Sequence, residues 1–372
     1  MKKPNKEISV FNTFMDASAK TDVGAVLEST FLSEGKLVKE FENLLNKNLG
    51  LKNPVAVNSG TSAIHLALIL AGIKEGDEVI CPAQTFVATA IAIMQCGATP
   101  IFADIQYETG NIDPNSIEQK ITKKTRAILP VHWGGYPCDM YEIRSLAKKH
   151  ELMVVGDAAH ALGATYKKKP IGSLSDFTCF SFQAIKHVTT GDGGAISCLK
   201  KSDAERAFVK RWFGIDRAHS KSSILGEREY DIKEIGYKYH LNDYAAALGI
   251  ANLKSFDKRL TRRRAIAKKY QKELANISGV KLFEYQNDRE SAYWLFGMHV
   301  EKREHFIRAL KERGIIASVV HRGIDHNTLF GGTKKELINQ RQFDETQIHI
   351  PLHDGLNNEE VSHIIASIKK GW

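Results

Sequence analysis

Apolar and polar positions alternate in blocks between about residues 54 and 200. Short apolar runs fit strands at 54–58, 78–81, 100–104, 127–131, 152–157, 177–181 and 194–198. Helical patterns follow the first two of these runs, at about 63–68 and 86–95. Strands that alternate with helices are typical of a sheet buried on both faces. The pattern therefore predicts an α/β domain with a mostly parallel sheet.

The last third of the chain has a different pattern. One long helical pattern covers about 244–274, a strand-like run covers 294–300, and helices are expected near 304–313 and 358–370. A chain of 372 residues is long for a single hydrophobic core. We therefore predict a large α/β domain at residues 1–245 and a smaller C-terminal α+β domain at residues 246–372.

Composition narrows the class of protein. The hydrophobic fraction of 43% and the charged fraction of 26% are ordinary for a soluble globular protein. No apolar run is long enough for a membrane span or a signal peptide, so we expect no membrane association and a cytoplasmic location. The five cysteines are scattered and odd in number, and they lack metal-type pairing. They are therefore expected to be buried thiols in a reducing compartment, with no metal site.

The formal net charge of +9 permits nucleic acid or acidic small molecules as partners. The excess is concentrated at 258–264 and 167–169. The first segment lies in an amphipathic helical pattern and is read most simply as a solvated helix face. Because no zinc-finger spacing and no aromatic–basic RNA motif accompanies it, we do not expect nucleic-acid binding.

Lys186 has the most informative surroundings in the chain. Aromatic and small residues precede it, and a glycine-rich turn at 191–194 follows it. Burial lowers the pKa of a lysine and makes its amine able to form a Schiff base with a carbonyl. The alternative is a lysine that extends from a loop edge into solvent.

A second candidate feature begins at the end of the first strand. Ser59, Gly60, Thr61 and Ser62 form a tight turn into a helix. The first backbone N–H groups of a helix and its dipole favour an anion, and the hydroxyls of Thr61 and Ser62 add donors. An ordinary helix cap is the alternative.

Three further positions fit a bound ligand. Asp157 ends an apolar strand, where ligand crevices form in α/β sheets, and His160 follows it closely. Phe86 stands where an aromatic ring can stack on a planar cofactor. Ser181 is a candidate phosphate ligand at a strand end. Each also has a structural alternative: a loop cap for Asp157 and Ser181, and core packing for His160 and Phe86.

The order and spacing of these features are more specific for one family than any single feature is. Further motifs include Gly76-Asp77-Glu78-Val79-Ile80, Gln84-Thr85-Phe86-Val87-Ala88-Thr89, Gly97-Ala98-Thr99-Pro100, Val131-His132-Trp133-Gly134-Gly135, Asp157-Ala158-Ala159-His160-Ala161 and His349-Ile350-Pro351-Leu352-His353. Together they resemble the fold-type I pyridoxal phosphate (PLP) enzymes, and more narrowly the DegT-type (DegT/StrS) nucleotide-sugar aminotransferases. The resemblance covers nearly the whole chain and implies an aspartate aminotransferase-like PLP-transferase fold.

The resemblance implies a role for each candidate residue. Lys186 would form the imine with PLP, and Asp157 would keep the pyridine nitrogen protonated so that the ring accepts electrons. His160 would lie beside the ring oxygen, and Phe86 would stack on the ring. The phosphate would be held by the turn at Gly60 with three hydroxyl residues, Thr61, Ser62 and Ser181.

One expected phosphate contact comes from a second subunit. In the family, a residue of the Gly-Tyr-x-Tyr stretch reaches the cofactor phosphate of the neighbouring protomer. Many members have Asn there, whereas this chain has Lys238. A lysine can bind phosphate as a point charge. The resemblance therefore implies a homodimer with shared active sites.

The implied reaction is transfer of an amino group from glutamate to a nucleotide-linked keto-sugar for amino-sugar and surface polysaccharide biosynthesis, with 2-oxoglutarate as the second product. Lysine rather than histidine at position 186 favours transamination over the dehydration that some relatives carry out. The stretch 318–326 departs from the commoner family pattern. His187, His321 and Arg322 are hypotheses for substrate contact.

Three alternatives remain open at this point. A cyclitol or carbocyclic ketone can take the place of the sugar, or the same scaffold can dehydrate a sugar. A protein of this fold can also be a regulator without enzymatic activity. A DNA-binding protein would show salt-dependent affinity, and no recognition motif supports it.

Overall fold

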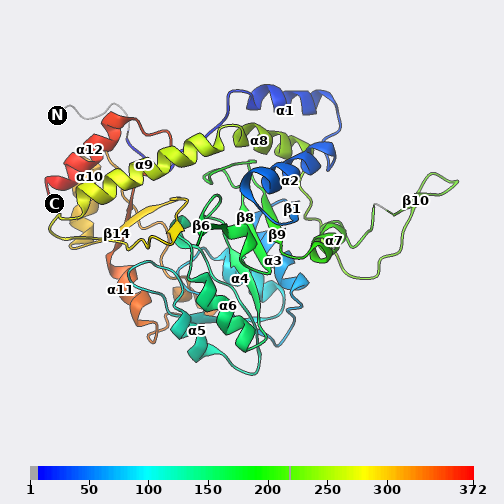
Figure 1. Ribbon diagram of the computed structural model, residues 1–372, viewed down its shortest axis with the longest axis horizontal. Coiled ribbons are helices and arrows are strands. Elements are labelled where there is room, and N and C mark those ends of the chain that lie inside the picture. Colours follow the sequence, from blue (N-terminus) through cyan, green and yellow to red (C-terminus); the bar gives the residue numbers. More distant parts are fainter. Residues whose placement is uncertain (1–6, 218) are drawn as a thin grey trace.

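The computed structural model describes residues 7–217 and 219–372. Its centre is a seven-stranded sheet in the order β1-β9-β8-β5-β4-β2-β3 (Figure 1). Neighbouring strands from β3 to β8 are parallel, and β9 is antiparallel to both β8 and β1. The strands are β1 (Pro54–Val57), β2 (Glu78–Pro82), β3 (Thr99–Ala103), β4 (Thr125–Ile128), β5 (Met153–Asp157), β8 (Phe177–Ser181) and β9 (Gly194–Cys198). The predicted α/β domain with a mostly parallel sheet is confirmed.

Helices cover both faces of this sheet. The core on one face includes buried residues of α3 (Gly60–Leu70), α4 (Ala88–Gln95) and α7 (Lys201–Lys210). The core on the other face includes buried residues of α2 (Lys36–Leu49), α5 (Pro114–Lys120), α6 (Met140–Lys149) and α8 (Asp243–Leu253). Because both faces are covered, the strands are apolar almost throughout, as the sequence pattern requires.

Two helix predictions need correction. The helix expected from residue 86 begins at Ala88, so Phe86 lies in the turn before α4. The long pattern at 244–274 is two helices, α8 and α9 (Phe256–Leu274), with a break at residues 254–255. The two helices meet different partners, since α8 contacts α1 (Ala19–Glu28) and α2 whereas α9 contacts α12 (Asn358–Lys369). A continuous apolar periodicity does not reveal such a break.

The C-terminal part contains a second, antiparallel sheet in the order β12-β14-β15. These strands are β12 (Val280–Leu282), β14 (Phe296–Val300) and β15 (Gln347–Ile350), and they share a core with α9, α10 (Arg303–Glu312) and α12. The intervening residues Ile324, Phe330 and Leu337 pack instead into the core beside α3 and α4, and α11 (Ile338–Thr346) follows them. The boundary near residue 245 stays a prediction.

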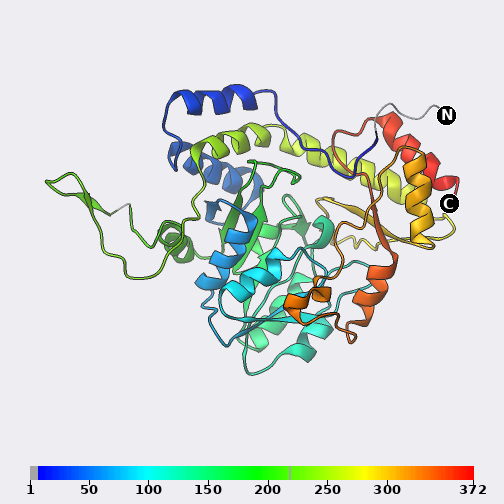
Figure 2. The same cartoon turned by 180° about the vertical axis from the view of Figure 1, so that it is seen from behind.

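The first described residues join this C-terminal part. Ile8 forms a parallel bridge with Ile315, and the ring of Phe11 lies 5.0 Å from the ring of Trp294. Figure 2 shows the N-terminal segment running along α9 toward α12. Ile8 and the C-terminal helix α12 are therefore packed in the same core.

A hairpin arm, residues 219–235, projects from the body of the protomer (Figures 1 and 2). It contains the short strands β10 (Lys221–Ser222) and β11 (Arg228–Glu229). Its apolar side chains Ile224, Leu225, Ile232 and Ile235 are exposed. Exposed apolar side chains on a two-stranded hairpin are typical of a surface that takes part in an interaction.

Two composition-based expectations can be compared with the structure. All five cysteines are free thiols, with Cys96 partly exposed and the other four buried. Within residues 7–217 and 219–372, no helix combines the length and the apolar character needed to cross a bilayer.

Candidate functional site

The turn between β1 and α3 is shaped as an anion site. Ser59 caps α3, and its Oγ accepts a hydrogen bond from the backbone N–H of Ser62 at 3.0 Å. The Ser62 hydroxyl donates to Asn58 Oδ1 at 2.7 Å. The first turn of α3 contains no acidic residue. The helix dipole and the leading N–H groups at Gly60 and Thr61 are therefore directed at a site without a competing carboxylate.

Close backbone packing brings Ser181 to this turn. A Cβ added at Gly60 would lie 2.9 Å from the Cβ of Ser181, and one added at Gly194 would lie 2.5 Å from the carbonyl oxygen of Ser59. Only glycine permits both approaches. The predicted phosphate residues Gly60, Thr61, Ser62 and Ser181 are thus brought together at the edge of the sheet.

Asp157 lies at the carboxyl end of β5 and is buried. Its Oδ2 accepts a hydrogen bond from the Thr89 hydroxyl at 2.8 Å, and its Oδ1 accepts one from the Ala159 N–H at 3.1 Å. Burial raises the pKa of the Asp157 carboxyl, while these donors and the nearby Lys186 oppose the rise. A cation placed against this carboxylate would favour its charged form.

His160 is buried, and its ring stacks on the indole of Trp294 at 3.8 Å with an interplanar angle of 11°. Burial holds the pKa of His160 well below its usual value, so the imidazole is neutral at pH 7. Among the described residues, its Nδ1 has no hydrogen-bond partner. A neutral ring with a buried, unpartnered nitrogen is suited to bind a polar atom of a ligand.

Lys186 reaches into the same region. Its Nζ lies 3.8 Å from the centre of the Trp294 ring. Burial lowers the pKa of the Lys186 amine to about 7, although the charge of Asp157 opposes this shift. A large fraction of the amine is therefore neutral at physiological pH, as Schiff-base chemistry requires.

Phe86 and His321 form an open wall of the site. Phe86 is 54% exposed, and its ring centre lies 5.3 Å from that of His321. Gln84 and Gln347 each donate a side-chain N–H to the backbone carbonyl of His321, both at 3.0 Å. Burial lowers the pKa of His321 to about 4. The exposed face of Phe86 is free to stack on a planar ring, with neutral His321 beside it.

Lys238 lies close to the anion turn through its backbone. The backbone N–H of Asn58 donates to the carbonyl of Tyr239 at 2.7 Å, and its side-chain amide donates to the carbonyl of Lys238 at 3.2 Å. The Lys238 side chain instead lies over Trp212, with Nζ 3.7 Å from the ring centre. Within one protomer, the ammonium is therefore held on an aromatic face.

Two other candidate substrate contacts, His187 and Arg322, have surroundings that differ from those of His321. His187 is buried, with Nε2 2.8 Å from the carbonyl oxygen of Ala292, and its own carbonyl accepts a bond from Arg259 at 2.7 Å. Arg322 is exposed. Burial and the positive charge of Arg322 lower the pKa of Arg303. The contacts of His187 are those of a packed core residue, so we do not carry it forward as a substrate contact.

Three contributors to the site have no role assigned by the sequence analysis, although two of them, Gln84 and Thr89, belong to the motif at 84–89. They are Thr89, which bonds Asp157, Trp294, which contacts Lys186 and His160, and Gln84, which fixes His321. Thr89 lies in the first turn of α4, but nothing in its position in the sequence indicates which strand it faces. Trp294 precedes β14 and belongs to the part of the sequence that we assigned to the small domain.

The residues present fit PLP. The glycine-lined turn at α3 offers an anion cradle, buried Asp157 offers a carboxylate, and His160 offers an unpartnered nitrogen. Lys186 supplies an amine whose pKa is near neutrality. The site thus has one group suited to each of four parts of PLP: the phosphate, the pyridine nitrogen, the ring oxygen and the aldehyde.

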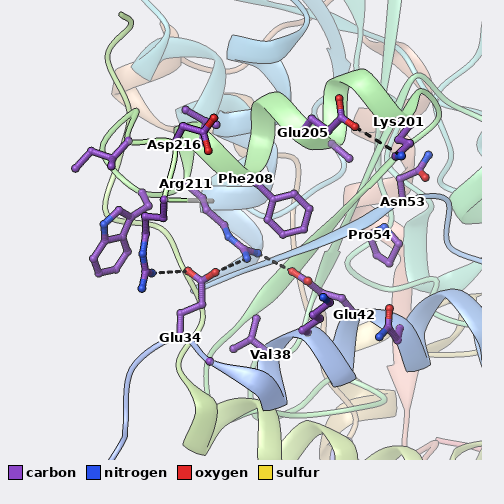
Figure 3. A pocket seen from close by; sticks show the side chains of 18 of the residues that line it. Glu34, Val38, Glu42, Asn53, Pro54, Lys201, Glu205, Phe208, Arg211 and Asp216 are labelled. Carbon is purple, nitrogen blue, oxygen red and sulfur yellow. Dashed lines mark hydrogen bonds and ion pairs between the residues drawn. The ribbon is translucent and has the colours of Figure 1, made fainter. Parts of the chain in front are cut away.

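A separate cavity of about 770 Å³ lies between α2, α7 and residues 211–217 (Figure 3). At its floor Arg211 donates to Glu34 Oε1 at 2.7 Å and to Glu42 Oε1 at 2.6 Å. None of the predicted site residues lines it. The guanidinium of Arg211 is therefore already paired with two carboxylates at this cavity.

Comparisons with known proteins agree with this geometry. Residues 14–369 match the family model described as the DegT/DnrJ/EryC1/StrS aminotransferase family. The chain is 34% identical over 370 residues to GDP-perosamine synthase from Escherichia coli O157:H7, covering 98% of each chain.

Two solved structures have the same fold. The sugar aminotransferase CalS13 from Micromonospora echinospora superposes with a TM-score of 0.93 and 35% identity, covering 98% of this chain and 100% of that chain. Spr1654 from Streptococcus pneumoniae, solved in a PLP form, superposes with a TM-score of 0.89 and 30% identity, covering 98% of each chain.

Proposed function

The chain belongs to the DegT/DnrJ/EryC1/StrS aminotransferase family, and we propose that it uses PLP to transfer an amino group to a keto-sugar carried on a nucleotide. The observation that carries this proposal is Lys186. Its amine has a pKa lowered to about 7 and lies in a site with a buried carboxylate at Asp157.

Each part of the cofactor has a group that would hold it. The turn at Gly60, Thr61 and Ser62, with Ser181, would bind the phosphate, and Phe86 would stack on the ring. Asp157 would pair with the pyridine nitrogen and His160 with the ring oxygen. When bound, PLP supplies an aldehyde that condenses with amines and a protonated ring that accepts electrons.

Lys186 carries out the proton transfers. As a neutral amine it accepts the proton from the α-carbon of the amino donor, and as an ammonium it gives a proton to the sugar carbon in the second half-reaction. Thr89 and the Ala159 N–H keep the Asp157 carboxylate oriented throughout. We propose glutamate as the donor and 2-oxoglutarate as its product, as the family resemblance implies.

The sugar nucleotide would approach along Phe86 and His321. This wall is open on the Phe86 side, and the backbone of His321 is fixed by two glutamines. GDP-perosamine synthase, to which the chain is similar along its whole length, has a nucleotide-linked product in its name. We propose His321 as a substrate contact, acting as a neutral hydrogen-bonding group, and Arg322 as a more peripheral one.

A homodimer with shared active sites is also part of the proposal. The exposed apolar side chains of the hairpin arm support a second copy as the surface that buries them. The arm leads directly to Lys238, which would contact the phosphate in the other protomer. The division at residue 245 into a large PLP-binding domain and a small domain likewise remains a proposal.

The test combines cofactor trapping with an amino-transfer assay. Protein incubated with PLP and reduced with borohydride should carry the cofactor on the peptide that contains Lys186. It should then form an amino-sugar nucleotide from glutamate and one member of a panel of nucleotide keto-sugars. Lys186→Ala should bind PLP without a trapped adduct and lose about 10²–10⁴-fold or more in turnover.

Two outcomes would contradict the proposal. Wild-type protein without a trapped adduct at Lys186 would exclude the chemistry. A trapped adduct together with loss of a sugar hydroxyl and no amine transfer would identify a dehydratase instead, and transfer only to a cyclic polyol ketone would replace the sugar nucleotide as acceptor.

A further inference from the structure

Trp294 is the residue of this site whose contacts are least explained by cofactor binding. It comes from the segment before β14, yet its side chain is buried beside Lys186 and His160. These contacts join a residue of the C-terminal part to the loops that follow β5 and β8 of the seven-stranded sheet.

Three contacts fix the plane of the indole. Its Nε1–H donates to the carbonyl of Ile185 at 3.0 Å, so the ring is tied to the residue before Lys186. The His160 ring stacks on it at 3.8 Å, and the Phe11 ring lies 5.0 Å away at 30°. The ring is therefore held in place independently of where the Lys186 side chain goes.

The Lys186 amine lies against this fixed ring. The distance of 3.8 Å between Nζ and the ring centre is within the range of a cation–π contact, which strengthens when the cation is removed from water. The other titratable groups that act on this amine are Asp157, which favours its charged form, and His160, His187 and His321, whose burial keeps them neutral. Trp294 is thus a direct aromatic partner for the ammonium.

We propose that Trp294 is a positioning residue that holds the amine of Lys186 whenever that amine is not bonded to the cofactor. This inference rests on the proposed function, in which Lys186 must leave the cofactor in each half-reaction and return to it. A free lysine with four flexible bonds would otherwise sample many positions. The indole gives it one position, and it favours the protonated form that must later donate to the sugar carbon.

The sign of a pKa change separates this role from simple burial. If the ring stabilises the ammonium, weakening its π face lowers the pKa of Lys186. If the ring only excludes water, removing it admits water and raises the pKa, because desolvation is what depresses a lysine. The two roles therefore predict opposite shifts.

The experiment uses protein loaded with pyridoxamine 5′-phosphate, in which Lys186 is not bonded to the cofactor. The rate of acetylation of Lys186 by acetic anhydride, followed by mass spectrometry from pH 5 to 10, reports the neutral fraction of its amine. The four tryptophans are replaced together by 5-fluorotryptophan or 5,7-difluorotryptophan, which weaken the π face with little change in size. The same replacement in Trp294→Phe protein is the matched control.

We expect the apparent pKa of Lys186 to fall stepwise with fluorination in wild-type protein, and to fall by about one unit in Trp294→Leu. Fluorination should leave the pKa in Trp294→Phe protein unchanged. Because fluorination preserves packing, the test does not depend on the folding of Trp294→Leu. A second control, Trp372→Phe, removes an indole that bonds Glu301 and packs on Phe306, and it should not move the pKa.

The proposal would be overturned if the pKa of Lys186 did not change with fluorination, or if it rose in Trp294→Leu. Equal pKa shifts on fluorination in wild-type and Trp294→Phe protein would also overturn it. Failure of the proposed function gives a different result. In that case wild-type protein shows no borohydride-trapped PLP on Lys186, whatever the fluorination series reports.

Discussion

At the residue scale, the hydrogen bonds to Asp157 offset part of the cost of its burial. Burial raises the pKa of the carboxyl, which favours the protonated and uncharged form. The Thr89 hydroxyl and the Ala159 N–H stabilise the anion instead. The carboxylate that a protonated pyridine requires is thus stabilised by Thr89, a residue that ends the motif at 84–89 but has no role assigned from the sequence.

Thr89→Val should weaken PLP binding about tenfold or more, because a hydrogen bond to a charged group is worth roughly 1.5–3 kcal/mol. Without this donor the pKa of Asp157 rises further, so the affinity lost should be greatest at low pH and partly recovered as pH rises. Asp157→Asn should show a larger loss that higher pH does not restore. A PLP titration followed by absorbance, between pH 6 and 9, measures both effects.

Thr85→Val is the matched control for this pair. The Thr85 hydroxyl contacts that of Thr89 at 2.6 Å, and Asp157 keeps its donor when Thr85 is replaced. If Thr89→Val bound PLP as tightly as Thr85→Val at all pH values, the hydrogen bond would have no role in holding the carboxylate.

The residues that could be predicted from the sequence are those whose neighbours in the chain reveal them. Asp157 ends a strand, Gly60 begins a helix, and Lys186 precedes a glycine-rich turn, and the structure brings all three into one region. Thr89 and Trp294 could not be predicted in this way. Their bonds connect positions 68 and 109 residues apart, and such contacts depend on packing alone.

At the element scale, the anion cradle depends on how closely α3 approaches β8 and β9. The approach is limited by Gly60 against Ser181 and by Gly194 against Ser59. A helix start that is pressed against two strand ends places its N–H groups and the Ser181 hydroxyl within reach of one anion. The geometry of two elements therefore decides the phosphate site.

Gly60→Ala should lower PLP affinity at least tenfold, because the added Cβ would lie 2.9 Å from Ser181 Cβ and would push α3 away from β8. Gly24→Ala, in α1, is the control, since a Cβ there meets no atom within 4 Å. Thermal unfolding should show at most a small change for Gly24→Ala. Equal PLP affinity in the two variants would contradict the close-packed cradle.

Elements with a clear period could be located from the sequence to within about three residues, as for the strand expected at 127–131 and found at Thr125–Ile128. The strands Phe177–Ser181 and Gly194–Cys198 coincide with the expected runs. The strand Val280–Leu282 has only three residues, too few to show alternation. The break between α8 and α9 was missed because both helices are apolar on the face that packs, so the period continues through it.

At the scale of the whole molecule, the hairpin arm carries apolar side chains that its own protomer does not cover. It extends away from the body with apolar side chains exposed at and beyond its tip. It also precedes Lys238, whose ammonium lies on Trp212 rather than at the cofactor turn of its own protomer. A second copy of the chain would give both features a partner.

Ile224→Asp combined with Leu225→Asp should weaken the proposed homodimer, because each carboxylate would have to be desolvated at the interface. Sedimentation velocity over a range of concentrations should show a shift from dimer to monomer. The control, Ile338→Asp, places the same charge at another exposed apolar position, on α11, and should leave the dimer intact. A wild-type protein that is monomeric and fully active would remove Lys238 from the site.

The packing of Phe11 on Trp294 and of Ile8 beside Ile315 affects how the chain is made. A nascent chain synthesised as far as Lys186 already contains the cofactor residues proposed between Gly60 and Lys186, although Lys238 is still to come. It must still wait for more than a hundred further residues before the indole that contacts that lysine emerges from the ribosome. The segment that contains Ile8 and Phe11 lacks its packing partners, Ile315 and Trp294, until these residues have been made. The site is therefore completed late in biosynthesis.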